Sequence, residues 1–186
     1  MKSFCCLLGS VLAVALSSQV AQAQEAKRFS LGENKEYSLP TPAEWLTKQP
    51  RTRIVEHEFE IKAAEGDEAT GRATVMAAGG SLEDNVKRWY GQFSQPDGSN
   101  TEERAKTKKT TVAGQEVHIV DVAGTYDDRP PFAASKGVQR PNYRMLAAII
   151  QTKKAGNYFI KFYGPAKTVT ENEAAFMKMI EGLQAN

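Results

Sequence analysis

Apolar and polar residues alternate in several segments of the chain, which predicts a protein built largely from β-strands. From Arg53 to Ile61, Val55 and every second residue after it would lie on one side of a strand, with Ile54 and three glutamates on the other. A second strand is predicted over Arg72–Ala78, so that the two segments form an antiparallel hairpin. Shorter strands are expected at Arg28–Leu31 and Tyr37–Leu39, before a proline-rich segment whose Trp45 would pack on the core.

The strongest helical pattern starts at Ser81. Ser81 in the N-cap position and Asp84 three residues later form a capping motif. Acidic and basic residues four apart, Glu83 with Lys87 and Asp84 with Arg88, favour the same helix. The apolar side of this helix is predicted to consist of Leu82, Val86, Trp89, Tyr90 and Phe93.

In the second half of the chain, a group of strands precedes a C-terminal helix. Met145–Ile150 is continuously apolar, as expected for a central strand covered on both faces, and Tyr158–Tyr163 is expected to pair with it. Thr170 and Glu173 repeat the capping motif before the apolar positions of the final helix. Further strands are predicted over Arg104–Val112 and Glu116–Tyr126. The sequence therefore predicts an α+β fold with an antiparallel β-sheet flanked by helices.

The first 23 residues have the pattern of a cleavable secretory signal peptide. Lys2 provides a positive start, Leu7–Leu16 is apolar, and Ala21-Gln22-Ala23 is a small-x-small cleavage site. The apolar stretch is too short for a membrane anchor, which needs about 20 apolar residues. Residues 1–23 are therefore predicted to be removed, which leaves residues 24–186 as a single α+β domain.

Composition excludes several classes of function. Both cysteines, Cys5 and Cys6, lie in the predicted signal peptide, so the mature chain has no disulfide, thiolate nucleophile or cysteine metal site. The formal net charge of the chain is only +2, which gives no global field for nucleic acid or acidic membranes. We therefore expect no nucleic-acid partner, and no transmembrane segment is predicted in the mature chain.

The segment Asn85–Phe93 (NVKRWYGQF) and the order of the predicted elements are similar to those of a known superfamily. One helix follows the first hairpin and another lies at the C-terminus, which resembles the PsbP/Mog-type α-β-α sandwich superfamily and its uncharacterised exported bacterial branch. This resemblance implies a PsbP-like fold. It also implies a non-enzymatic role, as an accessory or assembly factor or a small binding module, without catalytic residues.

The residues themselves give little support to an enzyme. His57 and His118 are the only histidines. Glu56 and Glu58 beside His57, and Asp121 three residues after His118, are expected to point to the opposite face of the strand from the histidine. The chain has no H-E-x-x-H, G-x-S-x-G or phosphate-loop motif. No catalytic residue, cofactor or metal site is therefore predicted. A secreted hydrolase or metal-dependent enzyme, with a site assembled from distant residues, stays open as the alternative.

The main candidate for binding is the segment Asp127–Asn142, which separates two predicted strands. Structureless loops of more than about 12–15 residues are uncommon in compact domains and are often functional. Its prolines reduce the entropy lost on docking, and an aromatic residue near basic ones suits a partner contact. The candidate binding residues are Arg129, Phe132, Lys136 and Arg140. An insertion without function is an equally open interpretation.

Two further polar groups are candidates for binding. Asn85, Arg88 and Gln92 share one stripe of the first predicted helix, where they would bind a ligand or tie the helix to a neighbouring loop. A second group falls on one face of a predicted strand and consists of Arg104, Lys106 and Lys108. These cations would contact a polyanion or, more simply, protect an exposed strand from edge-to-edge aggregation.

Together these features predict an exported, non-catalytic binding or accessory protein of the periplasm or cell envelope. The expected partner is an envelope or extracellular protein, recognised without a cofactor.

Overall fold

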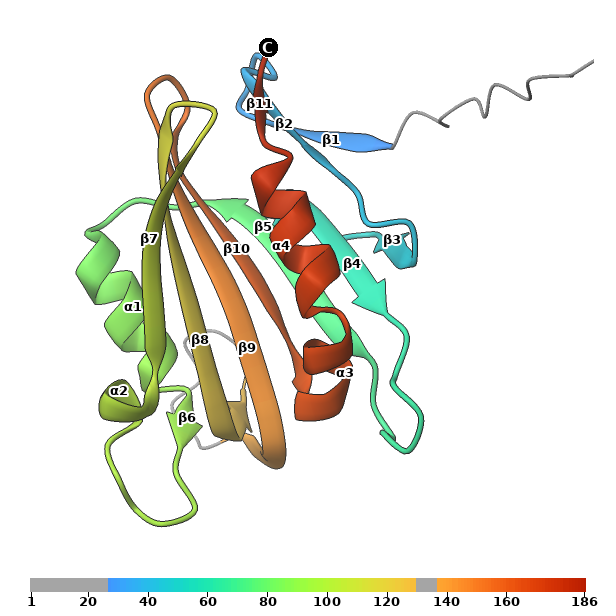
Figure 1. The fold of residues 1–186 in the computed structure, drawn as a ribbon, viewed down its shortest axis with the longest axis vertical. Coiled ribbons are helices and arrows are strands. Elements are labelled where there is room, and N and C mark those ends of the chain that lie inside the picture. The colour runs from blue at the N-terminus through green and yellow to red at the C-terminus, as the bar shows by residue number, and fades with distance from the viewer. Residues whose placement is uncertain (1–26, 130–136) are drawn as a thin grey trace, which may run out of the picture.

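An antiparallel sheet of eight strands forms the body of the protein (Figure 1). The computed structural model describes residues 27–129 and 137–186, so the predicted signal peptide lies outside the described residues. Along the sheet the strands are β3 (Trp45–Lys48), β4 (His57–Ile61), β5 (Gly71–Ala77), β10 (Gly156–Pro165), β9 (Val138–Thr152), β8 (Gln115–Asp128) and β6 (Phe93–Ser94), and β7 (Lys106–Val112) also pairs with β8.

A second, small sheet joins the N-terminal strands to the C-terminal end. It consists of β1 (Arg28–Leu31), β2 (Tyr37–Pro40) and β11 (Gln184–Ala185). One guanidinium nitrogen of Arg28 donates hydrogen bonds of 2.8 Å to the carbonyl oxygens of Ser38 and Gly182, which fixes β1 and β2 to the end of the last helix. The strands predicted at Arg28–Leu31 and Tyr37–Leu39 are confirmed.

The centre of the large sheet is the apolar segment of β9. Every residue from Met145 to Ile150 is buried, and β9 lies between β8 and β10, as the continuous apolar pattern predicts. Tyr158 and Tyr163 in β10 pair with Ile150 and Met145, so the predicted partner strand is also confirmed.

Helices pack on both faces of this sheet. On one face, α1 (Leu82–Tyr90) places Trp89 edge-on against Phe159, with the ring centroids 5.9 Å apart. On the other face, which is the near side in Figure 1, α3 (Ala166–Glu171) and α4 (Glu173–Glu181) cover the sheet, and Phe176 packs on Phe162. The short helix α2 (Thr101–Arg104) follows β6. None of the helices in residues 27–129 and 137–186 is long and apolar enough to span a bilayer.

The capping motif predicted at Ser81 is confirmed, whereas the one predicted at Thr170 is wrong. Ser81 Oγ accepts a hydrogen bond of 3.0 Å from the backbone N–H of Asp84, which satisfies one free donor at the start of α1. At the second site the helical turns begin at Ala166, directly after β10, and Thr170 Oγ donates back to the carbonyl oxygen of Ala166. Glu173 does not cap the helix, because its carboxylate pairs with Arg144 at 2.9 Å.

Other element boundaries also differ from the prediction. Arg104 ends helix α2 rather than starting a strand, because Asn100 caps that helix through a 2.9 Å hydrogen bond from the N–H of Glu102. Arg53 and Ile54 lie in a turn before β4. Phe93 is buried as expected but belongs to β6, since α1 ends at Tyr90. Trp45 packs on the core as predicted, although the proline-rich segment around it contains strand β3.

Both ends of the predicted long loop at Asp127–Asn142 belong to β-strands, and residues 130–136 lie outside the described residues. Asp127 and Asp128 belong to β8, and Val138–Asn142 belongs to β9. The ladder between the strands shifts register where Gly124 pairs with Tyr143 and Tyr126 pairs with Arg140. Pro141 lies at this bulge, where a strand tolerates a missing N–H. The candidates Phe132 and Lys136 lie outside the described residues.

Candidate functional site

A group of polar and aromatic side chains lies beside the C-terminal end of α1, on the face of the sheet that α1 covers. We call the side chains of Arg72, Gln92, Tyr126, Lys161 and Tyr163 the Lys161 cluster. They come from β5, the turn after α1, β8 and β10. Because side chains alternate along a strand, the side chains of Lys161 and Tyr163 in β10 share the face on which Phe159 meets α1.

Lys161 lies at the centre of this cluster. Its Nζ donates a hydrogen bond of 2.5 Å to Gln92 Oε1 and lies 3.5 Å from the hydroxyl of Tyr126. The same Nζ is 5.0 Å from the ring centroid of Tyr126 and 4.6 Å from that of Tyr163. Both rings therefore stabilise the ammonium group by cation–π contact.

Lys161 has no ion-pair partner in the part of the chain that the structure describes. No carboxylate oxygen of these residues lies within 4.0 Å of its Nζ. Burial, and then the nearby charge of Arg72, lower the pKa of Lys161 to about 7, with a smaller effect of Arg88 in the same direction and an opposing effect of Asp128. A charged amine on a half-buried residue, without a counter-charge, lowers the stability of the fold.

Arg72, in contrast, is neutralised by a buried carboxylate. Its guanidinium binds Glu58 through two hydrogen bonds of 2.8 and 2.9 Å. Glu58 is only 3% exposed and also accepts a hydrogen bond of 3.1 Å from the backbone N–H of Arg51. The bond from Arg72 keeps the pKa of Glu58 below its usual value. The remaining arm of Arg72 donates to the hydroxyl of Tyr163 at 2.7 Å, which fixes that ring next to Lys161.

Tyrosine rings form the other side of the cluster. Tyr126 lies 5.1 Å from Tyr163 and stacks on Tyr143 with the ring planes 5° apart. Burial raises the pKa of both Tyr126 and Tyr143, so their hydroxyl groups keep their protons at neutral pH. The phenols are therefore hydrogen-bond donors.

The polar stripe predicted on the first helix divides into structural and exposed parts. Asn85 is buried, and its amide donates to the carbonyl oxygens of Gly79 and Ser81, which ties the helix to the preceding turn. Arg88 is exposed and donates to the side-chain oxygen of Asn85, so the predicted pair with Asp84 is wrong. Only Gln92 belongs to the Lys161 cluster.

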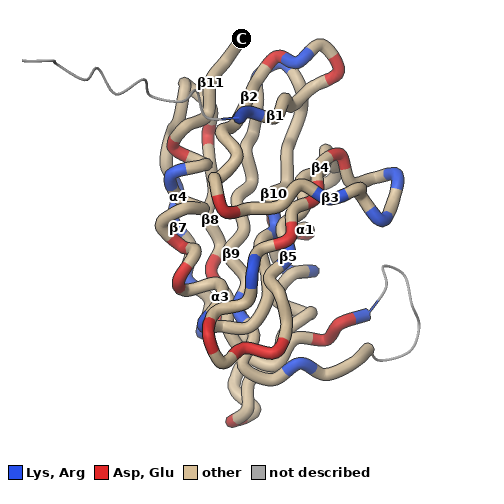
Figure 2. The backbone as a smooth tube through the Cα atoms, turned by 90° about the vertical axis from the view of Figure 1, so that its right-hand side faces the viewer, with Lys and Arg blue, Asp and Glu red and all other residues tan. Residues whose placement is uncertain are grey.

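The described residues of the predicted loop form ion pairs within the β8–β9 hairpin. Arg129 pairs with Asp127 at 3.3 Å, and Arg140 pairs with Asp128 at 3.1 Å. Figure 2 shows acidic and basic positions interspersed along the backbone of the protein. Arg140 pairs with Tyr126 across the strands, so it reaches the border of the Lys161 cluster.

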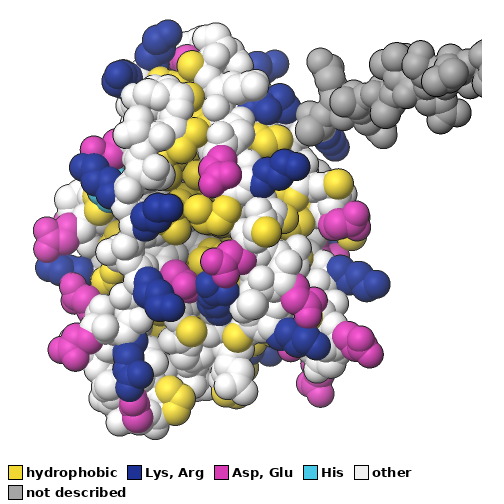
Figure 3. Space-filling model, viewed as in Figure 1, with side chains coloured by type: hydrophobic (Ala, Val, Ile, Leu, Met, Phe, Trp, Pro, Cys, Tyr) yellow, Lys and Arg dark blue, Asp and Glu magenta, His cyan; other side chains and the backbone are white. Residues whose placement is uncertain are grey.

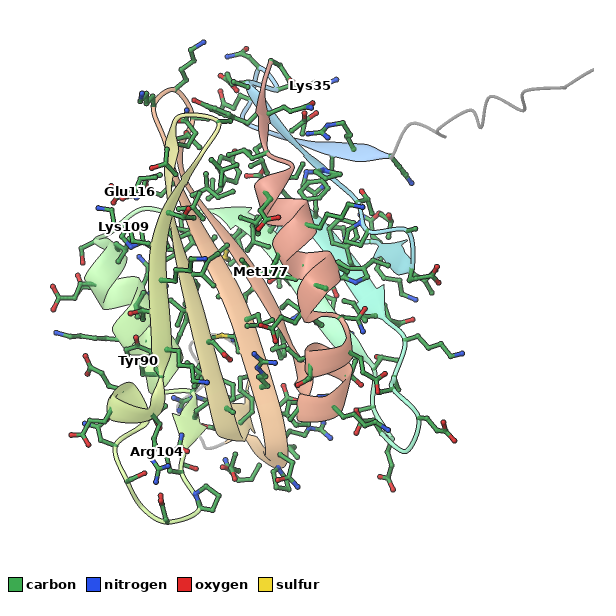
Figure 4. All side chains as sticks on the ribbon, in the orientation of Figure 1. Lys35, Tyr90, Arg104, Lys109, Glu116 and Met177 are labelled. Atoms are coloured by element: carbon green, nitrogen blue, oxygen red, sulfur yellow. The ribbon has the colours of Figure 1, made fainter. Side chains whose placement is uncertain are left out.

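The other candidates of the sequence lie apart from this cluster. His57 binds the carbonyl oxygen of Ser30 at 2.8 Å and His118 binds Glu116 at 2.6 Å. In residues 27–129 and 137–186 no three metal-ligating side chains gather to hold an ion. On β7, which pairs only with β8, Lys109 reaches across to Glu116 at 2.6 Å (Figure 4).

The surface view does not favour a polyanion site on the α4 side. Lysines and arginines are interspersed with acidic side chains over the face drawn in Figure 3. Lys106 and Lys108 are exposed on β7, in agreement with the simpler interpretation that they protect an edge strand.

A separate cavity of about 500 Å³ opens at the end of the sheet near the β1–β2 turn. Its lining includes Glu36, Glu56, Lys154 and Tyr158. Tyr158 and Lys161 are three positions apart in β10, so they point to opposite faces of the sheet. This cavity is therefore not part of the Lys161 cluster.

The chain has a PsbP-like fold. Among solved structures it matches the solution structure of cyanobacterial PsbP (CyanoP) from Synechocystis sp. PCC 6803, with a TM-score of 0.51 and 10% sequence identity over 92% of this chain and 99% of that chain. A crystal structure from Bacteroides thetaiotaomicron VPI-5482 matches with a TM-score of 0.43 and 12% identity, over 88% of this chain and 49% of that chain. No family model and no curated protein matches the chain.

The match with cyanobacterial PsbP agrees with the fold that the sequence resemblance implies. At 10% sequence identity, this match establishes the fold and no function.

The sequence prediction missed the centre of the cluster. Lys161 is the only charged residue in the run Tyr158–Tyr163, within a strand expected to lie beside the central one. A lysine in such a position is rare unless it is paired. This isolated charge is the signal in the sequence by which the site could have been found.

Proposed function

We propose that the protein is an exported, non-catalytic binding or accessory protein of the periplasm or cell envelope, and that the Lys161 cluster lies at its binding surface. The observation that carries this proposal is the half-buried residue Lys161, whose amine has no ion-pair partner among the described residues. An uncompensated charge reduces stability. Groups with this cost are typical of functional sites, where activity is kept at the expense of stability.

Two further observations support the proposal. The pattern of residues 1–23 favours export through the secretory pathway. Helix α1 packs on one face of the sheet, and α3 and α4 pack on the other, in agreement with an α-β-α sandwich. For the superfamily with this architecture, the sequence resemblance implies accessory and binding roles.

Cross-linking capture from envelope extract tests this proposal. The protein from Gln24 onward is compared with Lys161→Met and with Lys108→Met, which removes an exposed lysine from the edge strand β7. We expect the wild type and Lys108→Met to recover the same partner, identified by mass spectrometry, and Lys161→Met to lose it. If Lys161→Met recovers the same partner in equal amount, and the purified partner binds both proteins equally, the binding surface lies elsewhere.

A further inference from the structure

We propose that the Lys161 cluster binds a carboxylate group, with the ammonium of Lys161 as its ion-pair partner and a tyrosine hydroxyl of Tyr126 or Tyr163 as a second donor. This inference rests on the proposed function, because it names the ligand class of the same surface.

The charges around the cluster leave a positive excess at Lys161. Glu58 is fully engaged by Arg72 and Arg51, and Asp128 is engaged by Arg140 at 3.1 Å. Among the described residues, the amine of Lys161 contacts the neutral acceptor Gln92 Oε1 and the faces of two tyrosine rings. A negatively charged oxygen would supply the counter-charge that the fold does not provide.

The hydrogen-bonding groups around Lys161 favour an acceptor as the ligand. The hydroxyl of Tyr163 already accepts a hydrogen bond from Arg72, so its own proton is available for donation. The hydroxyl of Tyr126 lies 3.5 Å from Lys161 Nζ and keeps its proton at neutral pH, because burial raises its pKa. An ammonium and a phenol at this spacing present donors to the two oxygens of one carboxylate.

The number of unmatched charges favours a monoanion over a phosphate dianion. Arg72 is committed to Glu58, and Arg88 is exposed and donates to Asn85. Lys161 is thus the one cation of the cluster whose charge is not matched by a carboxylate within the described residues. A carboxylate matches that single charge, whereas a dianion would bring a second charge without a free cation.

Binding of a carboxylate is expected to be linked to protonation. Burial, followed by the charge of Arg72, lowers the pKa of Lys161 to about 7, with an opposing effect of Asp128 and a further lowering by Arg88. Only the protonated form of Lys161 attracts an anion. A bound carboxylate favours the charged form, so binding takes up a proton. Above neutral pH the apparent affinity should fall by up to about tenfold for each pH unit.

A small carboxylate and its neutral analogue provide the test. Isothermal titration calorimetry of the protein from Gln24 onward is carried out with benzoate and with benzamide, which has the same ring without the charge, at pH values below and above neutrality. We expect benzoate to bind more tightly at the lower pH and benzamide to show no comparable binding. Equal binding of the two compounds would overturn the proposal, and so would a preference for inorganic phosphate over benzoate.

Variants and a peptide refine this test. Lys161→Met should abolish benzoate binding, Lys161→Arg should retain part of it without the dependence on pH near neutrality, and Lys108→Met should leave it unchanged. Benzoate binding that survives in Lys161→Met would also overturn the proposal. A short blocked peptide with glutamate, compared with the same peptide with glutamine, tells whether an acidic side chain of a protein or a small free carboxylate is the better ligand.

The two proposals can fail separately. If benzoate and the glutamate peptide do not bind while envelope capture still depends on Lys161, the carboxylate assignment is wrong and the binding surface stands. If capture does not depend on Lys161, the surface itself is wrong.

Discussion

Replacement of Lys161 by methionine is expected to stabilise the fold while it removes ligand binding. Methionine has a similar length and removes a charge that no carboxylate of the described residues compensates. Exchange of buried charged groups for apolar ones is neutral or stabilising, and we expect a gain of about 1–3 kcal/mol in the free energy of unfolding at mildly acidic pH. Urea denaturation of the two proteins measures this difference.

The dependence of this gain on pH identifies its cause. The pKa of Lys161 is lowered to about 7 in the fold, whereas an unfolded lysine titrates near about 10.4. Between these values the unfolded chain binds more protons, so the wild type becomes more stable as the pH rises. The advantage of Lys161→Met is therefore largest below pH 7 and disappears on approach to the unfolded pKa. An equal gain at every pH would contradict the charge of Lys161 as the cause. The control Lys108→Met should differ from the wild type by less than about 0.5 kcal/mol in the free energy of unfolding at every pH.

Substitution of Glu58 by glutamine should have the largest destabilising effect among the charged residues discussed. Glu58 is 3% exposed and binds Arg72 through two hydrogen bonds. Its removal leaves the half-buried guanidinium of Arg72 without a counter-charge, which we expect to cost about 3 kcal/mol. The neighbouring pair of Lys48 and Glu60 provides a matched control, because its side chains are 47% and 34% exposed. Glu60→Gln should cost less than about 1 kcal/mol.

The acid limb of the stability curve gives a second readout of Glu58. The pKa of Glu58 is lowered in the fold. Its contribution to the free energy of unfolding is therefore present at neutral pH and is lost as the pH falls through the folded pKa. Glu58→Gln should therefore lose stability at neutral pH and approach the wild type under acidic conditions. A constant difference at all pH values would mean that the lost contribution is packing rather than charge.

The parts of the fold that the sequence predicted correctly depend on local signals. The hydroxyl of Ser81 accepts a bond from an N–H only three residues away, and the apolar run Met145–Ile150 is sufficient to indicate a strand buried on both faces. Each of these features is set by neighbouring residues, so one segment of sequence contains the information.

The strand residues at the two ends of Asp127–Asn142 were mistaken for part of a loop because their signals have two meanings. Pro141 normally argues against a strand, and Asn142 has a positive φ of 57°, which is typical of turns. In the fold both lie at the bulge where the β8–β9 register shifts, so the strands continue on either side. Whether such residues end a strand or bend it depends on the partner strand.

The candidate site could not be predicted from local pattern because its charges are balanced across the fold. Strand alternation places Glu58 opposite the apolar side of β4, which suggests an exposed carboxylate. Its burial is compensated by Arg72, from β5, and by Arg51. Likewise, Lys161 is a single charge in an apolar run, but its lack of an ion-pair partner among the described residues becomes visible only when β5, β8 and α1 are assembled around it.

The most direct measurement is the pH titration of Lys161 itself, followed by NMR at the methylene group next to its amine in lysine-labelled protein and assigned with Lys161→Arg. We predict a midpoint near pH 7, in keeping with a pKa of about 7, and a shift of this midpoint to higher pH when benzoate is added. A midpoint near about 10.4, the value of an exposed lysine, and unchanged by benzoate, would contradict both the uncompensated charge and the binding site built on it.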